Sequence, residues 1–352
     1  MRSLLSILLI GVPVTLILCL VGLSHGFIED SVRRQRGTGA DIIVRPKGST
    51  VLTLGYSMPA KLVEFFRAQP HVTLAVGIAN ATVEGVTLGA AGVDLKEFTD
   101  MSGGFTYRSG GPFQGPDDVI VDDFYADQKK LSPGSRIKLL NHDWRVSGVV
   151  ESGKLSHIVL PLTSLQDAKG DPGKVSQIYL KVDDPRNIKA TVDYLTHLPA
   201  LEDYPIVAME EFTSLLNVNN VPALRGFTIV IMAIGVVIGF AVVCLSMYMA
   251  VLQRTREIGI LKSLGGSKGF ILGIILVEAL MLGVGGTILG VLLSYGAYWL
   301  IHTLVPASFP MIIVYEWWPI AGAITLVATL LGALYPGLSA AAHDPIEALA
   351  YE

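Results

Sequence analysis

Four long apolar runs dominate the pattern of hydrophobic and polar positions along the chain. Each has at least the roughly 20 residues that an α-helix needs to cross a bilayer. We therefore predict transmembrane helices over residues 1–25, 226–252, 270–301 and 317–340. The first run exceeds the apolar stretch of about 7–15 residues found in signal peptides, and VGLSHGF is a poor cleavage site. A retained helix is favoured over a removed signal.

Between the first two runs the pattern changes to short segments separated by turn residues. ADIIVRP and HVTLAVGIANATVEGVTLGAAGV are typical of strands, whereas PAKLVEFFRAQP has the apolar spacing of a helix. SRIKLLNHDWRVSGVVE predicts a hairpin around an Asn-His-Asp turn, and SQIYLKVDDPRNIKATVDYLTHLP predicts a strand, a break and a helix. We expect the segment 26–225 to be a large α+β domain with antiparallel pairing, built as one body or as two subdomains.

The stretch 101–118, MSGGFTYRSGGPFQGPDD, is rich in glycine and proline. It predicts a flexible surface loop. Two interpretations stay open, a plain connection between subdomains and a contact for a partner protein or cargo.

Composition agrees with membrane insertion. The chain has 352 residues, of which 51% are hydrophobic and 16% charged, and its mean hydropathy is +0.55. Soluble domains average about 25% charged residues. The net charge of -4, with no basic tract, argues against nucleic acid as a partner.

Loop charges predict the orientation. The loop 253–269 carries Arg254, Arg256, Lys262 and Lys268 against one acid, Glu257. The positive-inside rule therefore places this loop in the cytoplasm. The connector 302–316, which has no Lys or Arg, and the domain 26–225 are then extracytoplasmic, and the tail 341–352 is cytoplasmic. The predicted fold class is a membrane protein with four transmembrane helices and a large extracytoplasmic α+β domain between helices 1 and 2.

No catalytic motif stands out. The P-loop pattern is absent, as are H-E-x-x-H, C-x-x-C and G-x-S-x-G. His71, His142, His157 and His197 lack metal-ligand spacing, and each is most simply a surface or core histidine. We expect neither a catalytic residue nor a metal or cofactor on this chain.

Glu278 is the ionisable residue within a predicted span. A charge there costs at least a few kcal/mol unless it is paired or hydrated. Glu278 either belongs to a proton or cargo route or is paired with a neighbouring helix, with Lys268 or with Lys262. The second interpretation is favoured.

Glycines in the predicted spans form flat strips that allow close helix packing. Such a strip serves packing within one bundle or a dimer interface. The candidates are Gly235, Gly239, Gly286 and Gly290.

The charged loop predicts a short amphipathic helix at the inner membrane surface. Its apolar arc consists of Ile258, Ile260, Leu261 and Leu264, and Gly265 with Gly266 should end it. Thr255, Gly259, Lys262 and Ser263 are predicted to lie opposite this arc.

This loop and the helix after it, RTREIGILKSLGGSKGFILGIILVEALMLGVGGTILG, closely resemble the matching region of the MacB/FtsX-type ABC transporter permeases. The tail YPGLSAAAHDPIEALAYE resembles the C-terminal signature of the same family, and LSPGSRIKLLNHDWRVSGVVESG is similar to its outer-domain hairpin. Together with the layout of helices, the resemblance covers essentially the whole chain.

The resemblance implies a non-catalytic permease subunit of an ABC exporter or extruder of the mechanotransmission type, in the bacterial cytoplasmic (inner) membrane. It implies a homodimer or a pair with a paralogous permease, and two copies of a separate ATPase that binds ATP and Mg. Whether a membrane-fusion or adaptor protein is a further partner stays open. The implied ATPase-coupling residues are Arg254, Thr255, Arg256, Glu257, Ile258, Lys262, Leu264 and Gly265, and a second ATPase contact is implied at Asp344, Pro345, Glu347 and Ala348.

Two alternatives to an exporter stay open. One is an FtsX-like signal transducer that regulates an extracytoplasmic cell-wall hydrolase, and the other is a membrane-anchored receptor or adhesin without a motor. Family members usually carry a basic amphipathic segment before the first span, whereas residues 1–3 alone precede it here. That segment is missing or the start lies upstream. The substrate is not indicated by the sequence.

Overall fold

The computed structural model describes residues 2–50, 57–84, 88–217, 220, 222–304 and 311–342. The chain divides into two compact units. A helical unit contains Met1–Gly26, Pro222–Leu304 and Met311–Glu352, and an α/β unit contains Phe27–Val221 and Val305–Pro310.

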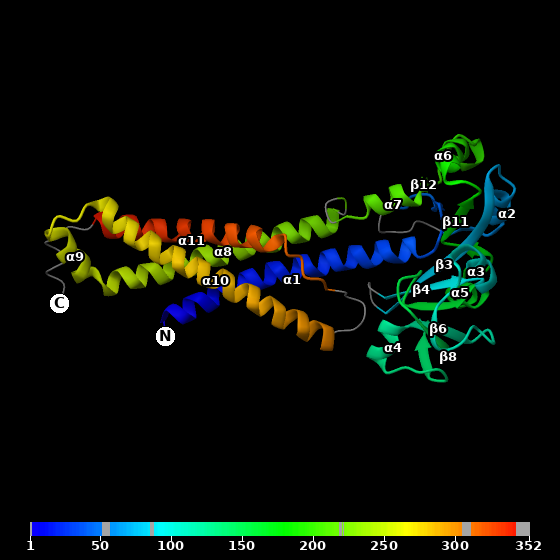
Figure 1. Ribbon diagram of the computed structural model, residues 1–352, viewed down its shortest axis with the longest axis horizontal. Helices are drawn as coiled ribbons and strands as arrows, with labels where there is room; N and C mark the ends of the chain where they lie inside the picture. Colours follow the sequence, from blue (N-terminus) through cyan, green and yellow to red (C-terminus); the bar gives the residue numbers. More distant parts are fainter. Residues whose placement is uncertain are drawn as a thin grey trace. The chain divides into compact units, whose positions relative to one another are not determined.

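The helical unit is built from four helices that are long and apolar enough to cross a membrane (Figure 1). They are α1 (Arg2–Arg36), α8 (Pro222–Gln253), α10 (Lys268–Leu304) and α11 (Trp317–Ala342), and the short helix α9 (Thr255–Ser263) joins α8 to α10. Helix α11 packs against both α8 and α10.

Helix α1 is longer than predicted. Its expected end was residue 25, but the helix continues to Arg36, and its last turns belong to the α/β unit. Asp30 forms ion pairs with Arg33 and Arg34 across one turn, and such pairs stabilise an exposed helix. The basic last turn also suits the negative end of the helix dipole. Polar residues therefore end the apolar run without ending the helix.

The predicted glycine strip of α10 serves helix packing within this chain, against α1. A Cβ added at Gly286 would lie 2.4 Å from the Ile10 side chain, and one at Gly290 would lie 2.6 Å from the Val14 side chain. Helices α1 and α10 therefore cross at these two positions, where a larger side chain would separate them. In α8, a Cβ added at Gly235 would lie 3.4 Å from the Ile17 side chain, whereas one added at Gly239 would meet no described atom within 4 Å.

The α/β unit is built on a ten-stranded sheet in the order β12-β1-β11-β3-β4-β9-β6-β8-β5, with β7 also paired to β8. The sheet strands are β1 (Ile42–Val44), β3 (Val72–Glu84), β4 (Leu88–Val93), β5 (Tyr107–Gly110), β6 (Asp118–Asp122), β7 (Arg136–Leu139), β8 (His142–Val150), β9 (Ile158–Pro161), β11 (Gln177–Val182) and β12 (Ile206–Ala208). A separate two-stranded sheet joins β2 (Met58–Pro59) to β10 (Lys174–Val175). Among the described residues, six helices accompany the sheets: α2 (Lys61–Arg67), α3 (Leu95–Ser102), α4 (Asp123–Lys129), α5 (Leu162–Lys169), α6 (Ile188–Thr196) and α7 (Met209–Leu215). Short 3-10 turns lie at Pro185–Asn187 and Pro199–Leu201.

Strand pairing is mixed, which corrects the expectation of antiparallel pairing alone. β4 pairs with β9 and β6 pairs with β8 in parallel, and the other described pairs are antiparallel. Two buried clusters lie on this sheet, one around Trp144 and one around Phe66. The long strand β3 contributes Ala79 to the first and Ala75 to the second, so one sheet supports two cores.

Local predictions in this unit hold with two corrections. The hairpin β7–β8 is present, but its turn is Leu140-Asn141, both at positive φ, and His142 already pairs with Leu139. The stretch 101–118, expected to be a loop throughout, contains the edge strand β5, which pairs with β8. Residues Ser109 and Gly110 therefore gain backbone partners that the glycine-rich pattern did not indicate.

Candidate functional site

The bend between α8 and α10 contains the predicted amphipathic helix. Helix α9 runs over Thr255–Ser263, and Gly265 follows it with φ of 97°. Gly265 donates its N–H to the carbonyl of Lys262 (3.0 Å), and Gly266 donates to Leu261 (2.9 Å). This pair of bonds is a Schellman cap, which needs a glycine at the left-handed position. The predicted role of the two glycines as the helix stop is confirmed.

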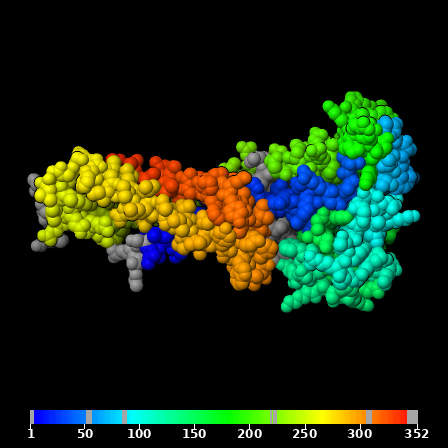
Figure 2. Space-filling view, in the orientation of Figure 1, coloured from blue at the N-terminus to red at the C-terminus, as the bar shows by residue number. Residues whose placement is uncertain are grey.

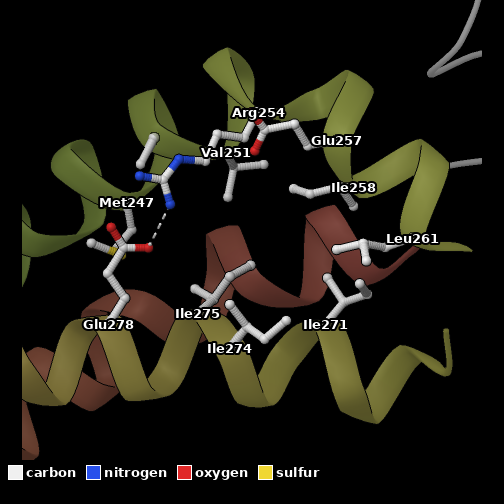
Figure 3. Close-up of a pocket in the computed structure, with 11 residues that line it drawn as sticks. Met247, Val251, Arg254, Glu257, Ile258, Leu261, Ile271, Ile274, Ile275 and Glu278 are labelled. Atoms are coloured by element: carbon white, nitrogen blue, oxygen red, sulfur yellow. Dashed lines mark hydrogen bonds and ion pairs between the residues drawn. The ribbon is translucent and has the colours of Figure 1, made fainter.

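The apolar arc of α9 is divided between an inner and an outer face. Ile258 and Leu261 face Val251 of α8 and Ile271 of α10 across a small cavity of about 100 Å³ (Figure 3). The outer face exposes Ile260 by 45% and Leu264 by 80%. Gly259, predicted to lie on the polar side, is buried instead, because α9 packs closely on the helices beneath it.

Glu278 pairs with a neighbouring helix, as the favoured interpretation allowed, but with a residue that the sequence did not indicate. Its carboxylate accepts a hydrogen bond from Arg254 Nη1 at 3.4 Å, at the junction of α8 and α9 (Figure 3). Lys268, one of the two expected partners, lies on the same helix ten residues away, which is about 15 Å along the axis. The side chain of Arg254 is 57% exposed and that of Glu278 35% exposed, so the helices of this chain do not enclose the pair.

Lys262, the other expected partner of Glu278, bonds elsewhere. Its Nζ donates to the carbonyl oxygen of Ala341 at 2.8 Å, in the last turn of α11. The final carbonyls of a helix lack intrahelical partners and carry partial negative charge. The lysine therefore caps α11 and connects it to α9.

The remaining coupling residues lie at the surface of the bend. Arg256 and Glu257 are exposed, and the hydroxyl of Thr255 donates to the carbonyls of Val251 (3.0 Å) and Leu252 (2.9 Å) in the last turn of α8. In Figure 2 the yellow atoms of this bend form one end of the helical unit. The predicted contacts Asp344, Pro345, Glu347 and Ala348 lie outside the described residues.

A groove of about 410 Å³ adjoins the bend between α1, α8 and α10, and its lining includes Leu5, Leu245, Arg254 and Glu278. Ser6 and Ser246 hydrogen-bond to each other there at 2.8 Å and join α1 to α8. The sequence did not indicate this bond, because single serines in apolar runs are common.

A buried charge cluster in the α/β unit was also missed. Arg34 bonds to Asp30 through Nε (2.6 Å) and to Asp122 Oδ2 through Nη2 (2.9 Å), and the same Asp122 oxygen accepts from Nδ1 of His157 at 2.8 Å. Arg34 is 6%, Asp122 2% and His157 8% exposed. His157 is thus a core histidine with a charged partner. No local pattern indicates the pairing, because Arg34 and Asp122 lie 88 positions apart.

The environment of Asp122 sets its charge. Burial raises the pKa of this carboxyl, but the hydrogen bond from His157 and the charge of Arg34 outweigh that effect, so its pKa lies below the usual range. The cluster joins the end of α1 to the β6–α4 corner. Next to it, Tyr179 donates its hydroxyl hydrogen to Gln35 at 2.8 Å.

Within the described residues, no three His, Cys, Asp or Glu side chains lie together. The bend provides a short helix with contacts to α8, α10 and α11 on one side and exposed leucine, isoleucine and charged side chains on the other.

Comparison with known proteins identifies the class. The family model described as MacB-like periplasmic core domain matches residues 3–198, and the FtsX-like permease C-terminal model matches residues 229–345. The uncharacterized ABC transporter permease YknZ of Bacillus subtilis (strain 168) is 31% identical over 229 residues, which cover 62% of this chain and 55% of YknZ. The macrolide export ATP-binding/permease protein MacB of Acinetobacter baylyi is 24% identical over 395 residues, which cover 100% of this chain and 57% of that protein.

Solved structures show similar domains. The periplasmic region of MacB from Actinobacillus actinomycetemcomitans has 15% sequence identity and a TM-score of 0.41, covering 51% of this chain and 94% of that one. The extracellular domain of YknZ has 17% identity and a TM-score of 0.37, covering 48% of this chain and 98% of that one.

Four apolar helices together with a large α/β domain define a membrane permease that carries a domain of the periplasmic type. The chain belongs to the MacB/FtsX-type family of ABC transporter permeases, as its sequence motifs predicted. It spans slightly more than half of the length of the curated relatives named here.

Proposed function

We propose that this chain is the transmembrane subunit of an ABC exporter or extruder, and that a separate ATPase docks on α9. The bend 253–269 then faces the cytoplasm of a bacterial inner membrane, and the α/β unit acts on substrate on the other side. The family implies an ABC ATPase partner. Two copies of that ATPase, and a second permease that is identical or paralogous, complete the proposed assembly.

The exposed outer face of α9 is the observation that carries this proposal. Leu264 is 80% and Ile260 45% exposed at the end of the bundle, next to the exposed charges of Arg256 and Glu257. Apolar anchors within a charged rim are typical of a surface that a protein partner covers. On its inner side the same helix contacts three membrane helices through Ile258, Arg254 and Lys262. If the ATPase displaced α9, these contacts would therefore transmit the displacement to the membrane helices.

The match of residues 3–198 to the MacB-like periplasmic core supports an exporter or extruder over an FtsX-like regulator. A membrane-fusion adaptor is compatible with this proposal. In this proposal the partner ATPase binds ATP and Mg, and this chain provides the docking surface and transmits the force.

The test is ATP hydrolysis by the complex isolated from its own membranes through a tag on this chain. Leu264→Asp places a charge in the proposed contact and should lower the associated hydrolysis at least tenfold, since a buried unpaired charge costs several kcal/mol. Leu304→Asp is the matched control, because Leu304 is 71% exposed at the other end of α10. A wild-type preparation without hydrolysis, or equal activity in all three, would contradict the proposal.

Two further variants separate coupling from assembly. Glu257→Arg reverses an exposed charge of α9, and Ile258→Pro removes a backbone donor that bonds to the Arg254 carbonyl at 3.0 Å. Both proteins should insert in the membrane at normal levels and lose transport-linked hydrolysis. Retention of wild-type transport by both would show that α9 is not the coupling element.

A further inference from the structure

The groove between α1, α8 and α10 has polar side chains at one end and apolar side chains at the other. Gln253 and Arg254 line its end nearest the bend, whereas Leu245 lies nine residues before Arg254, which is about 14 Å along α8. The order on α10 is the same, because Glu278 lines the groove about one turn nearer the bend than Leu282. The lining therefore becomes more apolar with distance from the bend.

This gradient matches the shape of an amphiphile. The helices that form the groove are long and apolar enough to cross a membrane, and Leu5, Leu245 and Met249 of its lining are exposed. The hydrogen bond between Ser6 and Ser246 holds two of its walls together. Its volume of about 410 Å³ lies within the range of ligand pockets, roughly 300–1,000 Å³. A headgroup at the polar end would place an acyl chain along the apolar end.

The polar end holds one charge of each sign. Arg254 Nη1 donates a hydrogen bond of 3.4 Å to Glu278, and among the described residues neither side chain makes another (Figure 3). A guanidinium carries several N–H donors and a carboxylate several acceptor sites, so most of this capacity is available to a ligand. Charged groups within a membrane helix are costly unless they are paired or hydrated. A ligand with charges of its own would satisfy both.

Charge complementarity selects among lipid headgroups. The lining of the groove has no net charge, because Arg254 and Glu278 are its charged members. An anionic headgroup would be attracted by Arg254 and repelled by Glu278. A zwitterionic headgroup gains from both, because its phosphate accepts bonds from the guanidinium and its ammonium donates to the carboxylate. A primary ammonium has N–H donors for this second bond, whereas a choline has none.

We propose that this groove binds a phospholipid with a zwitterionic, primary-amine headgroup, which is the chemistry of phosphatidylethanolamine. The phosphate contacts Arg254, the ammonium contacts Glu278, and an acyl chain lies along Leu245, Met249 and Leu282. The site is distinct from the exposed outer face of α9, so the inference goes beyond the proposed ATPase docking. It requires that the apolar helices lie in a membrane.

A second copy of this chain is the competing occupant, because it would cover the same leucines. In a two-fold contact the same surface patch meets itself, so that a groove at the symmetry axis faces another groove and stays unfilled. A hollow lining with opposite charges at one end therefore favours a lipid.

The first experiment locates the lipid on the full chain. Nanodiscs contain a small fraction of phosphatidylethanolamine with a photoreactive diazirine in one acyl chain. After illumination, peptide mass spectrometry should find more label on Leu245 and Met249 than on Leu292, which is similarly exposed but lies outside the groove. Equal labelling would overturn the site. A disulfide between two chains through Leu245→Cys, with Cys19 and Cys244 changed to alanine, would overturn it in favour of a second copy.

The second experiment measures lipid affinity by native mass spectrometry, with phosphatidylethanolamine and phosphatidylglycerol of identical acyl chains. The wild-type chain should bind the zwitterion about tenfold more tightly, the size expected for one charge-assisted hydrogen bond. Glu278→Gln should lose this preference, and Arg254→Gln should weaken both lipids about tenfold. Arg256→Gln is the control, because it removes the same charge from α9 outside the groove. Equal wild-type affinities, or a preference that survives Glu278→Gln, would overturn the headgroup assignment.

The apolar end is tested with the charges intact. Ala250→Phe fills part of the groove and should weaken both lipids about tenfold. Ala241→Phe is the matched control, because Ala241 is exposed on the same helix and lies outside the lining. Equal affinities of these two variants would overturn the acyl-chain placement. Glycerophosphoethanolamine, which has the headgroup without acyl chains, should not compete; competition as strong as that of the lipid would overturn the lipid in favour of a soluble phosphate compound.

Discussion

Two ionic contacts between distant segments differ sharply in their surroundings. In the α/β unit, Arg34 is 6% and Asp122 2% exposed, and the carboxylate is also bonded to His157. At the bend, Arg254 is 57% and Glu278 35% exposed, and their single bond measures 3.4 Å. A buried ion must keep its partners, because losing one leaves an uncompensated charge. A pair that protein does not enclose leaves no charge buried in the protein core when it opens, and its contribution to stability is small.

The comparison indicates different mechanical roles. The Arg34 cluster holds the end of α1 firmly in its own domain, with Gln35 bonded to the buried Tyr179 and Gly37 in close contact with the backbone of Gly153. The Arg254–Glu278 pair lies where α8, α9 and α10 meet, and its single bond of 3.4 Å constrains them weakly. One contact suits a fixed joint and the other a hinge.

The largest effect should come from breaking the buried cluster. Arg34→Leu removes the cation between Asp30 and Asp122, and we expect it to lower the free energy of unfolding of the α/β unit by about 3–5 kcal/mol. Arg33→Leu is the control, because Arg33 is 59% exposed although it also pairs with Asp30. Its cost should stay below about 1 kcal/mol. Denaturant unfolding of the full chain in nanodiscs measures both costs, followed through Trp144 after the other three tryptophans are changed to phenylalanine. Equal costs of the two variants would contradict the distinction.

A smaller loss of stability should follow when the pH is lowered. The pKa of Asp122 is lowered in the folded protein, because the bond from His157 and the charge of Arg34 outweigh its burial. Its stabilising contribution is therefore complete above the usual aspartate pKa of about 3.9 and is lost as the pH falls through the lower folded value. Unfolding measured from pH 6 to pH 2 should show this loss, and Asp122→Asn should flatten the curve. An unchanged slope in Asp122→Asn would assign the acid sensitivity to other carboxylates.

The smallest effect on stability should come from the hinge pair. Glu278→Gln and Arg254→Gln should each change the free energy of unfolding by less than about 1 kcal/mol, because the pair is exposed. Both should nevertheless alter ATP hydrolysis of the isolated complex several-fold. The exchange Arg254→Glu with Glu278→Arg restores opposite charges and should recover activity. Failure of this double variant, with the single variants impaired, would assign the two residues independent roles.

The helices and α9 could be predicted because their causes are local. Apolar runs of membrane length, the Gly265-Gly266 stop and the charges of the bend are all contained within a few turns of chain. The turn of the β7–β8 hairpin was misplaced, since Leu140 and Asn141 adopt positive φ without a glycine. The partner of Glu278 and the inward position of Gly259 were missed, because each depends on which helix packs against α9.

By itself, the sequence determined the family, the four apolar helices, the short helix between two of them and most local strands and turns. Short-range hydrophobic periodicity, turn residues and motif spacing are sufficient for these features. Tertiary structure alone decided the parallel pairing of β4 with β9, the burial of Arg34 against Asp122 and the contact of Lys262 with α11. Such contacts join segments far apart in the chain, and their free energy arises only when packing brings those segments together and excludes water.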